Sequence, residues 1–339
     1  MLFDRIKGQE SAVRILARAL ESGRMPTTFL FTGPSGCGRM GTALALAASF
    51  NCENSALACG SCQSCRLHIS NSHPDLVIVR PPEGKRVIVI EQIRTLIERA
   101  YLMPLMGTTS TFIVDGAHLM NPNAANALLK TLEEPPATSR FILIAPDRDS
   151  VLPTVSSRCR ILAFRPLSRS VMEALLEAEG IDKKRAALLA SMARGSMARG
   201  LEYHREEIPE RMAQEFGPLS SLHEAGPSRL LDLAKGWGKN RTEALKITEL
   251  MAQWYRDILV LSEGAPREQL IHSSHLATLR TLAEELGSAS LSMILESIED
   301  AREDLENNTN VELTMDNLLF RLRKFGRTGQ GNTLSREGF

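Results

Sequence analysis

The sequence predicts an α/β domain with a parallel sheet, followed by a region made of helices alone. Up to about position 165, short apolar and β-branched runs alternate with helical patterns of about ten to fifteen residues, which is typical of parallel sheets covered by helices on both faces. A glycine-rich turn at positions 33–38 follows the first run and opens a helix, at the edge where such sheets bind ligands. Beyond Pro166 the β-branched runs stop.

The composition fits a multidomain protein without a charge preference. The chain has 339 residues, more than one average domain, and its 40 lysines and arginines equal its 40 aspartates and glutamates. Any contact with a phosphate backbone must therefore come from a local patch. The first residues lack a basic and then apolar leader, and no run approaches the roughly 20 apolar residues of a membrane span. We expect a cytoplasmic protein without membrane contact.

An amphipathic helix and a short apolar strand lead into the glycine-rich turn. Apolar residues recur at helical spacing over 9–22, and the strand covers 29–31. Gly8 and Gln9, just before the helix, indicate by themselves only a turn at a helix start. An alanine- and leucine-rich helix over 40–50 follows the turn.

The turn has the form of a phosphate-binding loop, but its chemical groups are missing. In the pattern G-x-x-x-x-G-K-[S/T], glycines let backbone N–H groups wrap phosphates, the lysine reaches the outer phosphates and the hydroxyl binds magnesium. Gly33, Gly36 and Gly38 supply the backbone, while Arg39 takes the lysine position and Met40 the hydroxyl position. Arginine is a bulkier planar group, and methionine cannot bind magnesium, which needs oxygen ligands. We expect a degenerate nucleotide site; from this stretch alone, a chance glycine turn remains the alternative.

Four of the six cysteines are clustered, with two pairs at the two-residue spacing that lets both sulfurs face one ion. They are Cys52, Cys59, Cys62 and Cys65. Four thiolates leave no open position for a substrate, so the expected ion is a structural zinc in an insertion too short to fold on its own core. An iron–sulfur cluster is the competing metal site. Cys37 and Cys159 are expected to be packed thiols.

Two further β-branched runs, at 76–79 and 87–90, flank a Pro-Pro-Glu-Gly turn. We expect both to be strands, the second leading into a helix over 91–101.

The next strand begins at position 111 and ends in Asp115. In nucleotide hydrolases the corresponding aspartate holds magnesium, and a following glutamate commonly activates water. Here the next residue is Gly116, which cannot act as a base. A lone histidine at a strand end, His118, is expected to be packed or solvent-facing rather than catalytic.

A helix over 121–134 is stopped by two prolines, and strands follow at 141–144 and 160–164. Arg158 lies just before the second of these strands. By composition it is an arginine near a helix end, where a cation favours the helix dipole.

Helical patterns fill the rest of the chain, first in a small group and then in longer elements. They cover 171–180, 183–193, 196–203, 241–262, 273–286, 291–305 and 311–325. A stretch rich in glycine, proline and serine over 209–227 is predicted to be a linker, and the polar tail at 326–339 is predicted to be disordered.

Six motifs carry a resemblance to one known family. They are Gly8-Gln9, Leu30-Phe31-Thr32-Gly33-Pro34, the four clustered cysteines, Asn126-Ala127-Leu128-Leu129-Lys130-Thr131-Leu132-Glu133-Glu134-Pro135-Pro136, Ser157-Arg158-Cys159 and Gly195-Ser196-Met197-Ala198-Arg199-Gly200-Leu201. Together they resemble the clamp-loader subunits of the AAA+ class, and among these the delta-prime family of bacterial DNA polymerase III. The motifs span residues 3 to about 201, and beyond them the resemblance lies only in helical character.

The sequence departs from the ATP-hydrolysing gamma/tau members, which share the zinc insertion and the Ser-Arg-Cys motif. Those members keep a lysine and a threonine in the loop and an acidic pair after their second strand. This chain has Arg39, Met40 and Gly116 instead. It also has Ala145-Pro146 where an active member offers threonine or asparagine.

The resemblance implies a subunit that does not turn over ATP, completes a ring of similar subunits and supplies Arg158 as an arginine finger to a neighbour's ATP site. The implied cofactors are a structural Zn²⁺ and, in neighbouring subunits, ATP. The implied partners are the gamma/tau and delta subunits and, through the assembled complex, the sliding clamp and primed DNA.

The same resemblance divides the chain into four parts. These are an AAA+ phosphate-loop domain at 1–165 with the zinc insertion at about 51–66, a helical lid at 166–208, a helical collar at 209–325 and the tail at 326–339.

Two other functions fit the sequence less well. An active ATPase of the gamma/tau kind is disfavoured because lysine, hydroxyl and glutamate are missing together. A zinc-dependent nucleic-acid-binding module is disfavoured because no lysine or arginine lies between Cys52 and Cys65, which leaves no footprint for phosphates.

Overall fold

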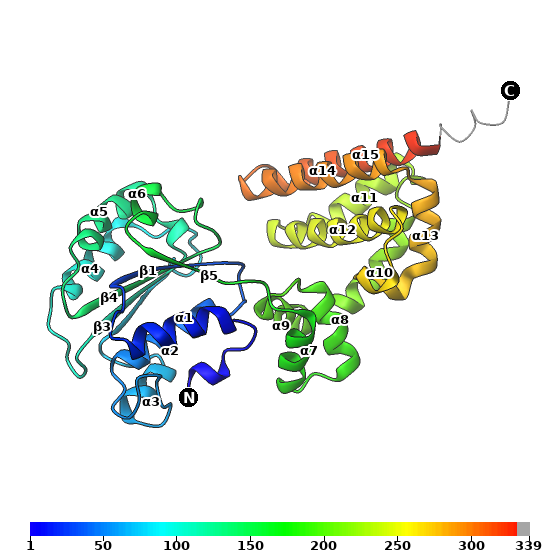
Figure 1. Cartoon of the computed structure of the whole chain (residues 1–339). Coiled ribbons are helices and arrows are strands. Elements are labelled where there is room, and N and C mark those ends of the chain that lie inside the picture. Colours follow the sequence, from blue (N-terminus) through cyan, green and yellow to red (C-terminus); the bar gives the residue numbers. More distant parts are fainter. Residues whose placement is uncertain (331–339) are drawn as a thin grey trace. The chain divides into compact units, whose positions relative to one another are not determined.

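The computed structural model describes the backbone of residues 1–330 and, within this range, the side chains outside positions 211–216, 268, 274 and 327–330. The chain divides into two compact units, Met1–Glu202 and the part that begins at Tyr203, and each is described by itself (Figure 1).

The first unit is built on a five-stranded sheet with the order β2-β3-β4-β1-β5, in which every strand pair is parallel. The strands are β1 (Thr28–Thr32), β2 (Leu76–Val79), β3 (Ser110–Asp115), β4 (Ser139–Ala145) and β5 (Arg160–Ala163). The register of the central pair places Thr28 of β1 opposite Phe141 and Thr32 opposite Ala145 of β4. The predicted parallel α/β class is confirmed.

Helices cover both faces of this sheet, as Figure 1 shows. They are α1 (Glu10–Glu21), α2 (Arg39–Phe50), α3 (Gln63–Ile69), α4 (Ile90–Ala100), α5 (Pro122–Glu133) and α6 (Pro153–Ser156). Phe29 and Phe31 pack into the apolar cluster that contains residues of α1 and α2, whereas Leu30 packs into the one that contains residues of α4 and α5. Because both faces are buried, the strands appear in the sequence as continuous apolar runs.

The predicted strand at 87–90 is wrong. Ile88 forms only an isolated parallel bridge with Met120, and α4 begins at Ile90. The Gln92 side chain accepts a hydrogen bond from the Val89 N–H at 3.2 Å, so the end of the run caps the helix. Ile88 is fully buried while Val87 is 43% exposed. Ile88 therefore packs into the core, and the run forms no strand pairing beyond its one bridge.

Three short helices complete the first unit. They are α7 (Arg169–Ala178), α8 (Lys183–Met192) and α9 (Met197–Arg205), whose last residues belong to the second unit. Ser168 caps α7 by accepting from the Val171 N–H, and Asp182 caps α8 by accepting from the N–H groups of Lys184 and Arg185. Such side-chain caps occupy N–H groups that a helix leaves without partners. The three helical patterns predicted here are present.

The second unit is helical throughout the part that the structure describes. Its helices are α10 (Ile208–Ser220), α11 (Pro227–Trp237), α12 (Arg241–Ser262), α13 (Leu276–Glu285), α14 (Ser288–Glu306) and α15 (Val311–Gln330). Short 3₁₀ turns lie at Phe3–Arg5 and Ala117–Leu119 in the first unit and at Arg267–Gln269 and Ser273–His275 in the second. Trp254 of α12 is fully buried, which agrees with the sequence-based expectation of an aromatic core anchor.

The predicted linker at 209–227 is wrong, because most of it forms α10. Pro209 lies in the first turn, where its missing N–H costs no helical hydrogen bond. Pro218 lies in the last turn, two residues before the helix ends at Ser220.

The C-terminal helix also extends further than predicted, since α15 continues to Gln330. Positions 326–330 are therefore helical, and the rest of the predicted tail lies outside the described residues. Among residues 1–330, no helix is both long enough and apolar enough to cross a membrane.

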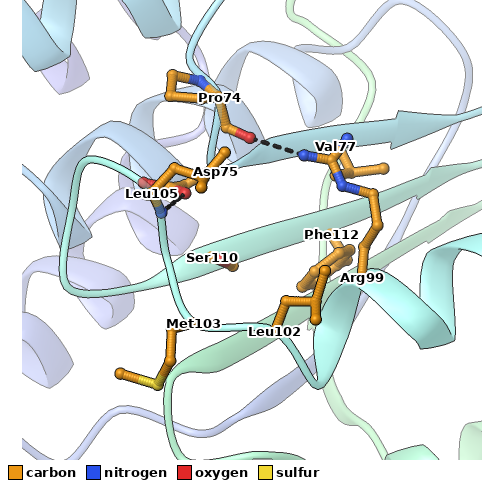
Figure 2. A pocket seen from close by; sticks show the side chains of 9 residues that line it. All are labelled: Pro74, Asp75, Val77, Arg99, Leu102, Met103, Leu105, Ser110 and Phe112. Carbon is orange, nitrogen blue, oxygen red and sulfur yellow. Dashed lines mark hydrogen bonds between the residues drawn. The ribbon is translucent and has the colours of Figure 1, made fainter.

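A buried carboxylate fixes the loop between α4 and β3. Asp75, which is 3% exposed, accepts the backbone N–H groups of Leu105, Met106 and Gly107 at 2.6, 2.9 and 2.7 Å. Figure 2 shows Leu105 at Asp75 and the Arg99 guanidinium reaching the Pro74 carbonyl, around a pocket of about 70 Å³. The loop carries exposed apolar side chains, including Met103 at 76%. Its shape therefore depends on Asp75 rather than on burial of its own side chains.

Replacing Asp75 with asparagine is expected to lower the free energy of unfolding by about 1–3 kcal/mol, since the amide cannot accept all three bonds. Burial alone would raise the pKa of Asp75, but the three backbone donors, with His73 nearby, lower it below 3.8. A carboxylate whose pKa is lower in the folded chain stabilises the fold at every pH above its unfolded pKa. This stabilisation is lost as the pH falls through the pKa of the folded chain. Urea unfolding should therefore show a difference between variant and wild type at pH 7 that shrinks below about pH 4.

The exposed Asp149, for which the structure gives no side-chain hydrogen bond, provides the matched control. Asp149→Asn should leave the unfolding curve unchanged. An equal loss in both variants would show that Asp75 contributes only its charge.

Candidate functional site

The predicted phosphate loop lies at the carboxyl end of the central strand. β1 ends at Thr32, the loop spans 33–38, and Gly38 is the N-cap of α2. The Gly33 N–H donates to the carbonyl of Pro146 at 2.8 Å, which ties the start of the loop to the segment after β4. The loop therefore has the strand-turn-helix context that the sequence predicted.

Gln9 clamps the loop to the chain that leaves β5. Its side-chain Nε2 donates to the carbonyls of Cys37 at 3.0 Å and Arg165 at 2.7 Å, and its Oε1 accepts the Arg165 N–H at 3.2 Å. A Cβ on Gly8 would lie 2.7 Å from Leu167 Cδ2. The Gly8-Gln9 pair thus joins distant parts of the chain, a role that neither its local context nor the composition indicated.

The start of α9 packs directly on the loop. The Met197 N–H donates to the Gly36 carbonyl at 3.0 Å, and a Cβ on Gly36 would lie 2.5 Å from Ser196 Oγ and 2.7 Å from the Ala198 backbone nitrogen. Only glycine permits this approach. Sequence reasoning noted both segments as motifs but did not predict that they touch, and no local pattern signals a contact between them.

The side chains of Arg39 and Met40 both contact other parts of the same chain. The Arg39 Nη1 donates to the carbonyl of Ala145, the last residue of β4. Met40 packs against the apolar cluster beneath the loop. The side chains at the lysine and hydroxyl positions thus bind to strand β4 and to the core, respectively.

A cavity of about 420 Å³ lies beside Arg39 and the end of β3. It is lined by Ser35, Arg39, Arg80, Pro81, Asp115, Gly116, His118, Leu119, Ile144 and Pro146. Gly116 has a φ of 96°, a left-handed conformation that would strain a glutamate. Burial, with the charge of Arg39, lowers the pKa of His118, so this imidazole is neutral at pH 7. Arg39 and Asp115 both line this cavity, and position 116 offers it no carboxylate.

The four clustered cysteines converge on one point. The Sγ atoms of Cys52, Cys59, Cys62 and Cys65 all lie within 4.8 Å of one another. Zinc with four thiolates at Zn–S of about 2.3 Å needs sulfur separations of about 3.8 Å, so small shifts suffice to bind it. Among the described residues, no other group of three or more histidine, cysteine or acidic ligands comes together in this way.

Backbone N–H groups point at the sulfurs. Cys59 donates to Cys52 Sγ at 3.3 Å, Cys62 donates to Cys59 Sγ at 3.3 Å, and Cys65 donates to Cys62 Sγ at 3.4 Å. Hydrogen bonds from the Ser61 hydroxyl and from the backbone N–H groups of Ser61 and Cys62 lower the pKa of Cys59 to about 5. At Cys59 these bonds favour the thiolate, the form that binds a metal ion, whereas burial raises the pKa of Cys65.

The cysteine insertion is anchored to the N-terminal segment. The Leu2 N–H donates to the Ala58 carbonyl at 2.9 Å, and Leu2 and Phe3 share one apolar cluster with Cys62.

The two remaining cysteines, Cys37 and Cys159, lie outside the insertion. Cys37 is fully buried in the same apolar cluster as Leu2 and Phe3, and Cys159 is half-buried, with its thiol donating to the Val155 carbonyl at 3.4 Å and its pKa raised to about 12 by burial.

Arg158 lies just after α6 and is held by its own chain. Its Nε donates to Glu133 Oε1 at 2.7 Å, its Nη2 donates to the same oxygen, and its Nη1 donates to the Thr154 carbonyl at 2.7 Å. The contact with Thr154 satisfies a carbonyl of α6, as the helix-end interpretation expects. Glu133 was not predicted as a partner of Arg158.

Two family models match the sequence. The one described as DNA polymerase III, delta subunit, matches residues 8–168, and the one described as DNA polymerase III, delta subunit, C terminal, matches residues 219–324.

Curated relatives extend over different shares of the chain. DNA polymerase III subunit delta' of Bacillus subtilis is 30% identical over 321 residues, which are 93% of this chain and 96% of that protein. Subunit delta' of Pseudomonas aeruginosa is 31% identical over 274 residues, or 77% of this chain and 79% of that protein. Subunit gamma/tau of Mycobacterium tuberculosis is 37% identical over 185 residues, or 53% of this chain and 32% of that protein. The first match runs along nearly the whole of both chains.

Proposed function

Since this chain belongs to the family of DNA polymerase III delta' subunits and is a clamp-loader subunit, we propose that it turns over no ATP and completes the loader ring. In that ring Arg158 acts as an arginine finger on the ATP site of a neighbouring subunit. By this proposal the chain is no enzyme by itself, but a component of the DNA polymerase III holoenzyme.

The lack of turnover rests on the loop. Phosphoryl transfer needs a cation at the outer phosphates, a magnesium ligand and a group that positions water. Arg39 instead donates to the Ala145 carbonyl, the partly buried Met40 packs against the core, and Gly116 carries no side chain. The observation that carries the proposal is the Arg39–Ala145 bond, because it uses the loop's cation to join α2 to β4.

The runner-up is an ATP-hydrolysing subunit of the gamma/tau kind. The three groups that hydrolysis needs, a lysine, a hydroxyl and a glutamate, are all replaced in this chain. We therefore favour the non-hydrolysing subunit.

The finger role rests on the position of Arg158. It follows the short helix α6 and lies two residues before β5 begins, at the amino edge of the sheet, and its side chain is 32% exposed. A guanidinium can meet two phosphate oxygens at once and stabilise the charge that develops during transfer. Supplied to a neighbour, it would also make this subunit sensitive to whether ATP is bound there.

For the cysteine site we propose one structural Zn²⁺ held by Cys52, Cys59, Cys62 and Cys65. The converging sulfurs and the N–H groups aimed at them fit four-thiolate coordination. The ion would join the two ends of the insertion and supply no chemistry to a substrate.

The proposed partners are the gamma/tau and delta subunits and, through the assembled loader, the sliding clamp and primed DNA. We assign the lid to residues 166–208 and the collar to 209–325, within which α11 to α15 would hold the ring together. Helices with one apolar side packed inward can bury their other side against partner helices.

The purified chain is expected to release no phosphate from ATP and to show at most weak magnesium-dependent binding in calorimetric titration. Mixed with gamma/tau and delta subunits, it should co-elute with them from a sizing column. Micromolar binding with phosphate release above the blank would show an active enzyme. Failure to co-elute would remove the assembly role.

A further inference from the structure

The Arg158 guanidinium is almost fully engaged within its own chain. Besides the bonds to Glu133 and Thr154, Nη1 lies 3.4 Å from Ser157 Oγ. Arginine has five N–H donors, and these four contacts leave one of them, on Nη2, without a partner. A phosphate that binds two parallel N–H groups must therefore displace at least one present acceptor.

Of the three acceptors, Glu133 is the one whose release frees most of the guanidinium. It is the only charged one of the three, it takes two of the N–H groups, and its side chain is 47% exposed and can swing away. Thr154 and Ser157 are neighbours of Arg158 in sequence and accept through a backbone carbonyl and a hydroxyl. Glu133, in contrast, comes from another helix.

Packing fixes the place of Glu133 relative to Arg158. Glu133 is the last residue of α5, which two prolines prevent from continuing. Leu132 of α5 and Val155 of α6 are buried in the same apolar cluster, so the two helix ends meet in one arrangement. The backbone of Glu133 is therefore held next to Arg158, while its exposed side chain can move.

We infer that Glu133 is a positioning residue that holds Arg158 against its own chain until the terminal phosphate of a neighbour's ATP displaces the carboxylate. The inference rests on the proposed finger role of Arg158. With the neighbouring site empty, the finger stays bound to Glu133. With ATP present, the phosphate and Glu133 compete for the same N–H groups, so Glu133 sets how much ATP is needed to recruit the finger.

The test uses the assembled loader with Glu133→Gln in this subunit, which keeps the side-chain shape and removes the competing charge. We expect the KM for ATP to fall by about 1.5- to fivefold, the range that exposed ion pairs contribute. We expect kcat to stay within about twofold, because the transition-state contact of Arg158 is unchanged. The Kd of a non-hydrolysable ATP analogue should fall in parallel.

The neighbouring Glu134 supplies the matched control, since Glu134→Gln removes the same charge one residue away and should leave KM and kcat unchanged. In an Arg158→Ala background, Glu133→Gln should have no further effect. Glu133→Asp, whose side chain is one methylene shorter, should lower the KM for ATP as Glu133→Gln does. Melting temperatures check that each variant folds.

The outcomes separate two failures. If Arg158→Ala leaves the ATPase of the assembled loader unchanged, the finger role itself is wrong. If Arg158→Ala lowers the ATPase but Glu133→Gln leaves KM unchanged, raises it or lowers kcat, the finger stands and the competition by Glu133 is wrong. An effect of Glu133→Gln that persists without Arg158 would also overturn the inference.

Discussion

Replacing Cys62 with serine is expected to release the metal ion and unfold the insertion between α2 and α3, while the sheet stays folded. A structural zinc contributes on the order of 10 kcal/mol to a small site, far more than the few apolar contacts of such an insertion. Cys62 also caps α3, because its sulfur accepts the Cys65 N–H, so the helix start should loosen too. The sheet has its own core on both faces and does not depend on the ion.

Elemental analysis and amide hydrogen exchange test this expectation together. Wild type prepared without chelator should contain one zinc per chain and Cys62→Ser none, with faster exchange confined to residues 52–69. Cys159→Ser removes a thiol outside the cluster and should keep the zinc. Iron in the wild type would support the cluster alternative, and a wild type without metal would refute the site.

Replacing Arg158 with alanine is expected to lower the ATPase of the assembled loader and the loading of the clamp onto primed DNA. Arginine fingers contribute on the order of 10³ to 10⁵ in rate where they have been measured in other systems, and here the loss would apply to the one site that this subunit serves. Lysine should rescue poorly, because it keeps the charge but not the planar fork that meets phosphate oxygens in pairs.

The melting temperature and the ATPase of the same variant, measured together, separate the finger role from the helix-end interpretation. Loss of the bond to the Thr154 carbonyl and of the surface ion pair with Glu133 should cost at most about 1 kcal/mol, and entry into the complex should be unchanged. A small loss of stability with an unchanged ATPase in a fully assembled ring would leave Arg158 as a helix cap and nothing more.

The elements that the sequence predicted well are those that are buried on two sides or capped locally. β1, β3 and β4 appear as apolar runs because helices cover both faces of the sheet. α12 begins at Arg241, as predicted, because the Asn240 side chain accepts the Glu243 N–H at 2.9 Å. The cysteine cluster was predictable because its ligands lie close together in sequence.

One miss follows from a contact that local patterns do not encode, whereas another had a local signal. Ile88 is β-branched and buried, yet its partner is a segment after β3 and not a sheet edge. α11 was left unassigned, although Leu230, Ala234 and Trp237 recur at helical spacing and are buried. That signal was available.

In the candidate site, the sequence indicated which groups are missing but not what replaces them. The bond from Arg39 to Ala145, the packing of α9 on Gly36 and the pair between Glu133 and Arg158 all join segments that are far apart in sequence. Each depends on the folded arrangement of complete elements, so none could be derived from residue types and spacing.

The strand order has a consequence for the time course of synthesis. β1 is made first, but its sheet partners β4 and β5 begin only at Ser139 and Arg160, so the apolar strand with Phe29 and Phe31 leaves the ribosome long before it can pair. β2 and β3 are both made before β4, so they can pair at one edge while β1 still lacks both of its partners. Long-range parallel pairings of this kind form slowly and expose apolar surface meanwhile. The loop at the end of β1 gains its last contacts only when Arg165 arrives to bind Gln9 and Met197 to bind Gly36.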